Sequence, residues 1–80
     1  MKNKSFRLLD IQEISKRTGF SLSLLNYYTN LGLLPVADRQ GNKRLFMERI
    51  VIGRLGQIRR LRREGYPLRI IRHRFKEERL

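Results

Sequence analysis

The sequence predicts a mainly α-helical domain of four helices with one short β-hairpin, and three features predict it. Four stretches carry apolar residues at helical spacing, and each is bounded by a cap, a glycine or a proline. Between the second and third stretches, Gly41-Asn42 separates two short extended segments, as in a hairpin. At 80 residues the chain has room for one domain with a small core.

The first helix is expected over residues 11–18. Asp10 is a good N-cap, and Glu13 three residues later completes a capping box, in which each residue satisfies a backbone N–H of the other. Gly19 ends the helix, because glycine adopts the left-handed conformation of a C-cap without strain.

A second helix is expected over residues 22–31, since Ser21 supplies an N-cap and Gly32 a stop. Helical spacing predicts a buried stripe of Leu24 or Leu25, Tyr28 and Leu31. The opposite face then presents Leu22, Ser23, Asn26, Tyr27 and Asn30. Two short helices joined by a glycine turn form a helix-turn-helix.

Residues 36–39 and 43–46 are expected to pair as the strands of the hairpin, around a turn at 40–42. A hairpin this short is not stable alone, so it must pack against the helices, with Phe46 as its anchor. Its exposed residues are mainly basic, which describes a wing. The predicted fold class is therefore a mainly α winged helix-turn-helix, with four helices and one short β-hairpin wing.

The last two helices are expected over residues 48–64 and from Pro67 to about 78, separated by Gly65-Tyr66. Met47 is a poor N-cap, so packing must hold the third helix. The residues expected to face inward are Val51, Leu55, Ile58 and Leu61 or Arg62 in the third helix, and Leu68, Ile71 and Phe75 in the fourth.

The charge balance indicates a polyanionic partner. Lys and Arg number 19 against 7 Asp and Glu, a net charge of +12, and 14 of the 19 are Arg. Nucleic acid is the simplest partner, because each neutralised phosphate releases counterions and the planar guanidinium fits phosphate and guanine. An acidic protein or an anionic membrane are the alternatives, but no segment joins a basic face to a broad apolar one, so no membrane is expected.

Composition also excludes several classes of protein. No cysteine is present, which excludes a disulfide scaffold, a thiolate zinc site and a redox switch. His73 is the only histidine. It is expected to be exposed between two arginines, and a single histidine without cysteines does not form a metal site. No serine has a His and acid set to activate it, and no phosphate-binding glycine motif occurs. We expect no enzyme, no cofactor and a cytoplasmic, nucleoid-associated protein.

Five short pieces follow one another along the chain: ISKRTG at 14–19, YY at 27–28, GLLP at 32–35, GNKRLF at 41–46, and IRRLR at 58–62 followed by Gly65-Tyr66. In this order they resemble the N-terminal winged helix-turn-helix domain of the MerR family of transcription regulators. The resemblance implies such a domain at 8–80, after a flexible basic arm over 1–7. It implies sequence-specific binding to double-stranded DNA, with the second helix in the major groove and the wing on phosphates.

Four departures limit what the resemblance carries over. The family usually has Arg where this chain has Asn26, and an acidic residue where it has Thr29. The interval from Phe46 to Gly65 is one residue longer than usual. The long helix through which family members dimerise is not in the chain. A homodimer is expected only with such a helix, and otherwise a monomer or cooperative assembly on DNA.

The expected DNA-binding residues come from the hinge, the second helix and the wing. Ser and Asn side chains can read base edges, and Tyr hydroxyls commonly bind phosphates. For the cations before the hinge, a phosphate contact and a solvated surface charge are both open. The full set is Lys16, Arg17, Ser21, Leu22, Ser23, Asn26, Tyr27, Arg39, Lys43 and Arg44.

Transcription regulation, with RNA polymerase as a further partner, is the function that this pattern favours. Two alternatives stay open on the sequence. A stand-alone winged helix could act as an excisionase-like architectural factor that coats or bends DNA. The other is a basic module that docks on RNA or on an acidic protein through its Arg-rich third and fourth helices. Most of those arginines are expected to form a solvated face.

Overall fold

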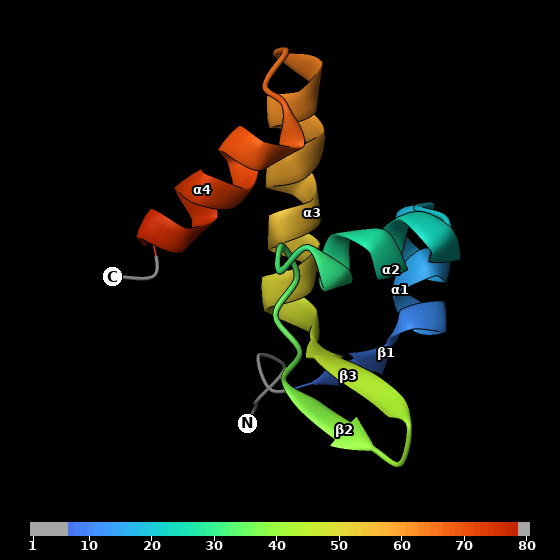
Figure 1. Ribbon diagram of the computed structural model, residues 1–80. Helices are drawn as coiled ribbons and strands as arrows, with labels where there is room; N and C mark the ends of the chain where they lie inside the picture. The colour runs from blue at the N-terminus through green and yellow to red at the C-terminus, as the bar shows by residue number, and fades with distance from the viewer. Residues whose placement is uncertain (1–6, 79–80) are drawn as a thin grey trace.

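The computed structural model describes residues 7–78 of the chain (Figure 1). In chain order its elements are β1 (Leu8–Asp10), α1 (Ile11–Thr18), α2 (Leu22–Asn30), β2 (Asp38–Gln40), β3 (Lys43–Met47), α3 (Glu48–Arg63) and α4 (Leu68–Glu78). The four predicted helices and the predicted hairpin are confirmed. Residues 1–6 of the predicted arm lie outside the described residues. Arg7 joins the fold, since its carbonyl accepts a hydrogen bond from the Glu48 N–H at 2.9 Å.

The helix-turn-helix consists of two capped helices. Asp10 Oδ1 accepts from the Glu13 N–H at 2.9 Å and Glu13 Oε1 accepts from the Asp10 N–H at 2.9 Å, so the predicted capping box is confirmed. Gly19 ends α1 with a φ of 81°, in the left-handed region that favours glycine. Ser21 then caps α2, because its side chain accepts the Leu24 N–H at 3.1 Å. Caps on both sides of this short link define how α2 leaves α1.

The sheet has three antiparallel strands in the order β1-β3-β2, one more than the sequence predicted. β1 pairs with β3 so that Leu9 lies opposite Phe46. β2 and β3 form the hairpin around a tight turn in which Gly41 has a φ of 63°. The Ala37 N–H donates to the Leu45 carbonyl at 2.8 Å, which continues the pairing beyond β2. The wing is therefore tied to the start of α1 through β1.

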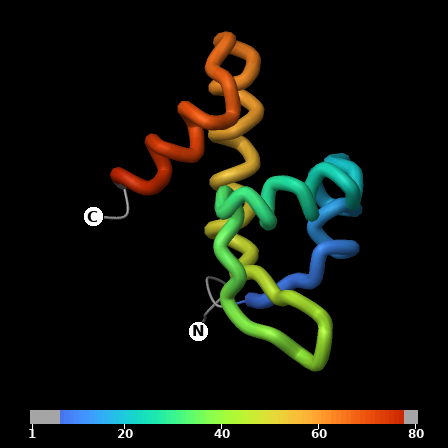
Figure 2. The backbone as a smooth tube through the Cα atoms, in the orientation of Figure 1, coloured from blue at the N-terminus to red at the C-terminus, as the bar shows by residue number. Residues whose placement is uncertain are grey.

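α3 is the central element of the fold. In Figures 1 and 2, α1 and α2 lie on one side of it, α4 folds back on the other, and the sheet lies at its first turn. Of the alternatives left open by helical spacing, Leu25 rather than Leu24 and Leu61 rather than Arg62 are buried. The core comprises Leu9, Ile14, Leu25, Tyr28, Leu33, Leu34, Phe46, Val51, Leu55, Ile58, Leu61, Ile71 and Phe75.

Packing rather than capping holds α3 and α4. Met47 makes no side-chain cap hydrogen bond, as expected from the sequence. Burial of an aliphatic side chain such as Leu55 contributes about 2 kcal/mol, more than a missing cap loses. After α3 the chain turns at Gly65, whose φ is 100°, and the Tyr66 N–H donates to the Leu61 carbonyl at 3.0 Å. This turn directs α4 back along α3.

Candidate nucleic-acid interface

One side of α2 is exposed and uncharged; we call it the α2 face. Leu25 and Tyr28 anchor the opposite side of the helix in the core. Two large apolar or aromatic side chains nevertheless point to solvent, with Leu22 exposed by 41% and Tyr27 by 51%. Both side chains are therefore accessible for contact with another molecule. The α2 face comprises Leu22, Ser23, Asn26, Tyr27 and Asn30, all of them exposed.

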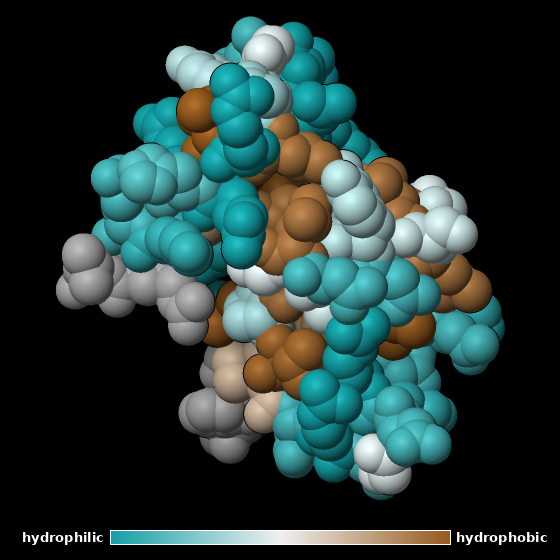
Figure 3. Space-filling view, viewed as in Figure 1, coloured by the Kyte–Doolittle hydropathy of each residue, from teal (hydrophilic) through white to brown (hydrophobic). Residues whose placement is uncertain are grey.

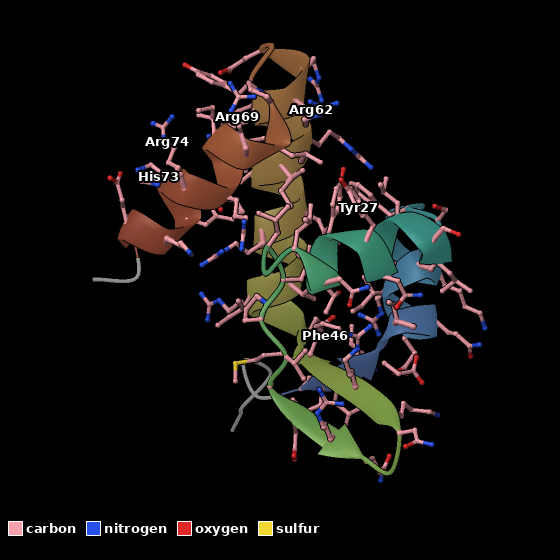
Figure 4. All side chains as sticks on the ribbon, viewed as in Figure 1. Tyr27, Phe46, Arg62, Arg69, His73 and Arg74 are labelled. Carbon is pink, nitrogen blue, oxygen red and sulfur yellow. The ribbon has the colours of Figure 1, made fainter. Side chains whose placement is uncertain are left out.

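The two adjacent tyrosines have different environments. Tyr28 is buried, as predicted, and its ring lies edge-on to Phe20 with the centroids 6.3 Å apart. Burial raises the pKa of the Tyr28 hydroxyl, because the charged form loses its hydration. Tyr27 is instead exposed, on the upper side of α2 in the view of Figure 4, with the wing below that helix. Its ring centroid lies 6.3 Å from that of Tyr28, so a packed aromatic ring supports an exposed one.

The wing carries three of the predicted cations. Lys43 Nζ lies 3.5 Å from Asp10 Oδ2, which ties the hairpin to the N-cap of α1. The pKa of Asp10 is lowered, first by the hydrogen bond from the Glu13 N–H and further by the charge of Lys43. Arg39 is exposed on β2 and lies opposite Arg44 in the strand register. Phe46 is fully buried beneath the wing, so the prediction that it anchors the wing to the core is confirmed (Figure 4).

Arg44 joins the wing to the α2 face. Its Nη2 donates to Asn26 Oδ1 at 3.0 Å, and its Nη1 donates to Asn30 Oδ1 at 3.2 Å. We call these three residues the clip. Asn30 was placed on the exposed face by its spacing but was not among the predicted site residues. The signal that identifies it is its four-residue distance from Asn26, which puts both amides on one side of the helix.

The two cations before the hinge differ in their surroundings. Arg17 forms an ion pair with Glu48 at the first turn of α3, so part of its charge is already balanced. Lys16 is exposed and lines a shallow hollow with Gln12, Ser15 and Leu22, next to the α2 face. The structure thus brings Lys16 and the α2 face together, and it directs Arg17 toward α3.

Three arginines of α3 have structural contacts that the sequence did not reveal. Arg54 lies over the Phe75 ring at 4.2 Å, and Arg59 lies over the Phe20 ring at 4.6 Å. Arg62 Nη1 donates to the Tyr66 carbonyl at 3.3 Å, at the turn into α4. Cation–π contacts of this kind stabilise a fold by about 0.5–1 kcal/mol when they are exposed. These arginines therefore contribute in part to the stability of the fold.

Six further cations of α3 and α4, from Arg60 onward, form an exposed set that we call the arginine face. Figure 4 shows Arg69 and Arg74 on α4, on the side of α3 away from α2. Figure 3 shows hydrophilic surface over α4 and over the wing, with apolar surface between α4 and α2. The arginine face comprises Arg60, Arg63, Arg69, Arg72, Arg74 and Lys76, all of them exposed.

His73 lies on α4 with Nε2 at 3.3 Å from Glu77 Oε2, and both side chains are exposed. Among residues 7–78, no three His, Cys, Asp or Glu side chains form a group that could hold a metal ion. In the same part of the chain, no helix is both long and apolar enough to cross a membrane.

A helix-turn-helix with an exposed second helix, a cationic wing beside it and a strongly basic surface defines a DNA-binding domain. The family model described as MerR HTH family regulatory protein matches residues 9–78. The chain therefore belongs to the MerR family of helix-turn-helix regulators and is a DNA-binding transcription regulator of that type. Neither the curated proteins nor the solved structures give a significant match to this chain.

Proposed function

We propose that this domain binds double-stranded DNA sequence-specifically, with α2 in the major groove and the wing on the phosphates. The observation that carries the proposal is the clip, through which an exposed, uncharged helix face adjoins a cationic hairpin. A major groove about 12 Å wide admits one helix, and a wing beside that helix then meets the bordering backbone.

The α2 face supplies the groups that sequence reading needs. Ser23 and Asn26 carry donors and acceptors that match base edges in the major groove. Leu22 suits apolar contact with a thymine methyl group. The Tyr27 hydroxyl suits a phosphate oxygen at the groove edge. Because α2 itself bears no charged residue, its contribution is selectivity more than affinity.

Affinity then comes from the surrounding cations and from the start of α2. Arg39, Lys43 and Arg44 of the wing would bind phosphates on one side of the groove and Lys16 on the other; Arg17 would join Lys16 only by leaving its ion pair with Glu48. Ser21 lies at the N-terminal end of α2, where free backbone N–H groups favour a phosphate. Every phosphate neutralised in this way steepens the loss of affinity with salt.

Family membership supports three broader proposals. As a MerR-type regulator, the protein would act at promoters, with RNA polymerase as its further partner. It would work in the cytoplasm at the nucleoid, where its DNA is. Each domain would occupy one half-site, since one module of this size makes few contacts.

A gel-shift or anisotropy titration tests the proposal. The probes are a random duplex, the duplex upstream of the protein's own gene and a structured RNA, each at two salt concentrations. We expect tighter binding to duplex than to RNA, and an affinity that falls by about tenfold or more between 50 and 200 mM salt. Equal affinity for RNA and duplex, or an affinity insensitive to salt, would contradict the proposal.

A further inference from the structure

The clip fixes the orientation of the Asn26 amide. Asn26 and Asn30 both turn Oδ1 toward the wing, where the two Nη atoms of Arg44 donate to them at 3.0 and 3.2 Å. A guanidinium is a rigid, planar fork with a full positive charge, so it binds two carbonyl oxygens at once. Charge-assisted hydrogen bonds of this kind are stronger than neutral ones. The amide oxygen is thereby held on the wing side of α2.

An asparagine amide has an acceptor at one end and donors at the other. When Arg44 holds the Asn26 oxygen, the Nδ2 donors at the other end of the amide remain free of that contact. We propose that Arg44 is a positioning residue that presents Asn26 to the major groove as a hydrogen-bond donor. This inference rests on the proposed function, because it concerns the base that the α2 face selects.

Presentation of the Nδ2 donors has a consequence for base preference. The usual asparagine contact to adenine is bidentate, and the amide oxygen must accept from the adenine N6 amine. The clip occupies one of the two lone pairs of that oxygen and turns it toward the wing, which disfavours the bidentate contact. Guanine presents two acceptors in the major groove, N7 and O6, and thymine presents O4, whereas adenine presents N7 beside an amine donor. Asn26 therefore selects guanine or thymine at the base pair it meets, and it disfavours adenine.

Arg44 can hold the clip and bind a phosphate at the same time. A guanidinium has five N–H donors, and the two contacts to Asn26 and Asn30 leave the others available. Lysine at this position would keep the positive charge for the phosphate. It lacks the planar fork and would not hold two amide oxygens in a fixed geometry. Arg44→Lys thus separates the positioning role from the electrostatic one.

Arg39 provides the matched control. It is exposed on the neighbouring strand directly opposite Arg44, so it shares the position on the wing. Within residues 7–78, its side chain makes no hydrogen bond to α2, and its backbone N–H donates to Asp38. Arg39→Ala removes one wing cation without touching the clip.

The experiment is a selection of bound sequences from a randomised duplex pool, carried out with the wild type, Arg44→Lys, Arg39→Ala and Asn26→Ala. We expect the wild type to enrich a motif with guanine or thymine at one position. Arg44→Lys should shift that position toward adenine by about 5- to 20-fold in relative affinity and leave the rest of the motif unchanged. Arg39→Ala should weaken binding to all sequences alike. Asn26→Ala should remove the preference at that same position.

Thermal unfolding of each variant establishes that all four proteins are folded at the selection temperature.

Two results would overturn the inference and are distinguishable from each other. If Arg44→Lys and the wild type enrich the same motif while Asn26→Ala changes it, Asn26 reads a base without help from Arg44. In that case the proposed function stands and the positioning role does not. If the wild type enriches no motif from the pool, the proposed sequence-specific function fails and the inference fails with it.

Discussion

The α2 face and the arginine face are two opposite kinds of exposed surface, one polar and uncharged, the other densely cationic. The α2 face has no charged residue, and three of the cations near it, Arg44, Lys43 and Arg17, are tied to it or to the rest of the fold. α3 and α4 together hold 10 of the 19 Lys and Arg, six and four respectively. The proposed function assigns selectivity to the polar groups of the α2 face and affinity to the wing cations beside them, and it gives the denser charge of the arginine face only a long-range effect.

The largest expected effect separates the two adjacent tyrosines. Tyr28→Ala should lower the free energy of unfolding by about 3 kcal/mol, because it leaves a cavity beside Phe20 in a small core. Tyr27→Ala should lower it by less than about 1 kcal/mol but weaken binding to duplex DNA. Urea unfolding measures the first effect and a duplex titration the second. Equal destabilisation by the two substitutions would contradict the exposure that sets Tyr27 apart.

Charge-matched variants test the contrast between the wing and the arginine face. Arg39→Gln with Lys43→Gln removes two cations from the wing, and Arg72→Gln with Lys76→Gln removes two from α4. The wing pair should weaken duplex binding by about tenfold or more and reduce the salt slope by about two. The α4 pair acts only through long-range attraction and should change affinity by about twofold. A larger loss of affinity from the α4 pair would indicate that the DNA binds to the arginine face.

The N-cap of α1 should show a smaller effect that depends on pH. Asp10→Ala should lower the free energy of unfolding at pH 7 by about 1 kcal/mol, because it removes the cap of the first helix. The pKa of Asp10 is lowered in the folded protein from its ordinary value of 3.8, so its stabilisation is present above that pH. It is lost as the pH falls through the folded pKa.

Urea unfolding at pH 6 and at pH 3 measures this dependence. The difference in stability between the wild type and Asp10→Asn should shrink at the lower pH, since only the wild type loses a carboxylate there. The Asn side chain still accepts the cap hydrogen bond and serves as the control. A gap that stays constant from pH 6 to pH 3 would show that the Asp10 pKa is not lowered by folding.

The smallest effect is expected at His73. Its contact with Glu77 is an exposed pair one helical turn apart, which contributes about 0.5 kcal/mol at most. His73→Ala should leave unfolding and duplex binding nearly unchanged in parallel measurements at pH 6 and pH 8. A loss of affinity of fivefold or more would give the arginine face a specific role in recognition.

Local signals in the sequence predicted most of the helices and strands. The features that the sequence did not predict depend on contacts between residues that are distant in the chain. The capping box at Asp10 and the breaks at Gly19 and Gly65 are local, so the helix bounds could be predicted. β1 could not, because three residues show no periodicity and its partner β3 lies far along the chain. Contacts at the candidate site, such as Arg44 with Asn26, also depend on tertiary placement. Exposure of Tyr27 beside the buried Tyr28 followed from helical spacing alone.

The most direct test of the α2 face is an NMR titration of the isotope-labelled protein with a short duplex, following every backbone amide. We expect the largest chemical-shift changes at residues 21–30 and 38–44, with small changes at residues 69–76. Shifts concentrated in residues 69–76, with those of α2 unchanged, would show that the DNA lies on α4 and would contradict the assignment of α2 as the helix that reads the groove.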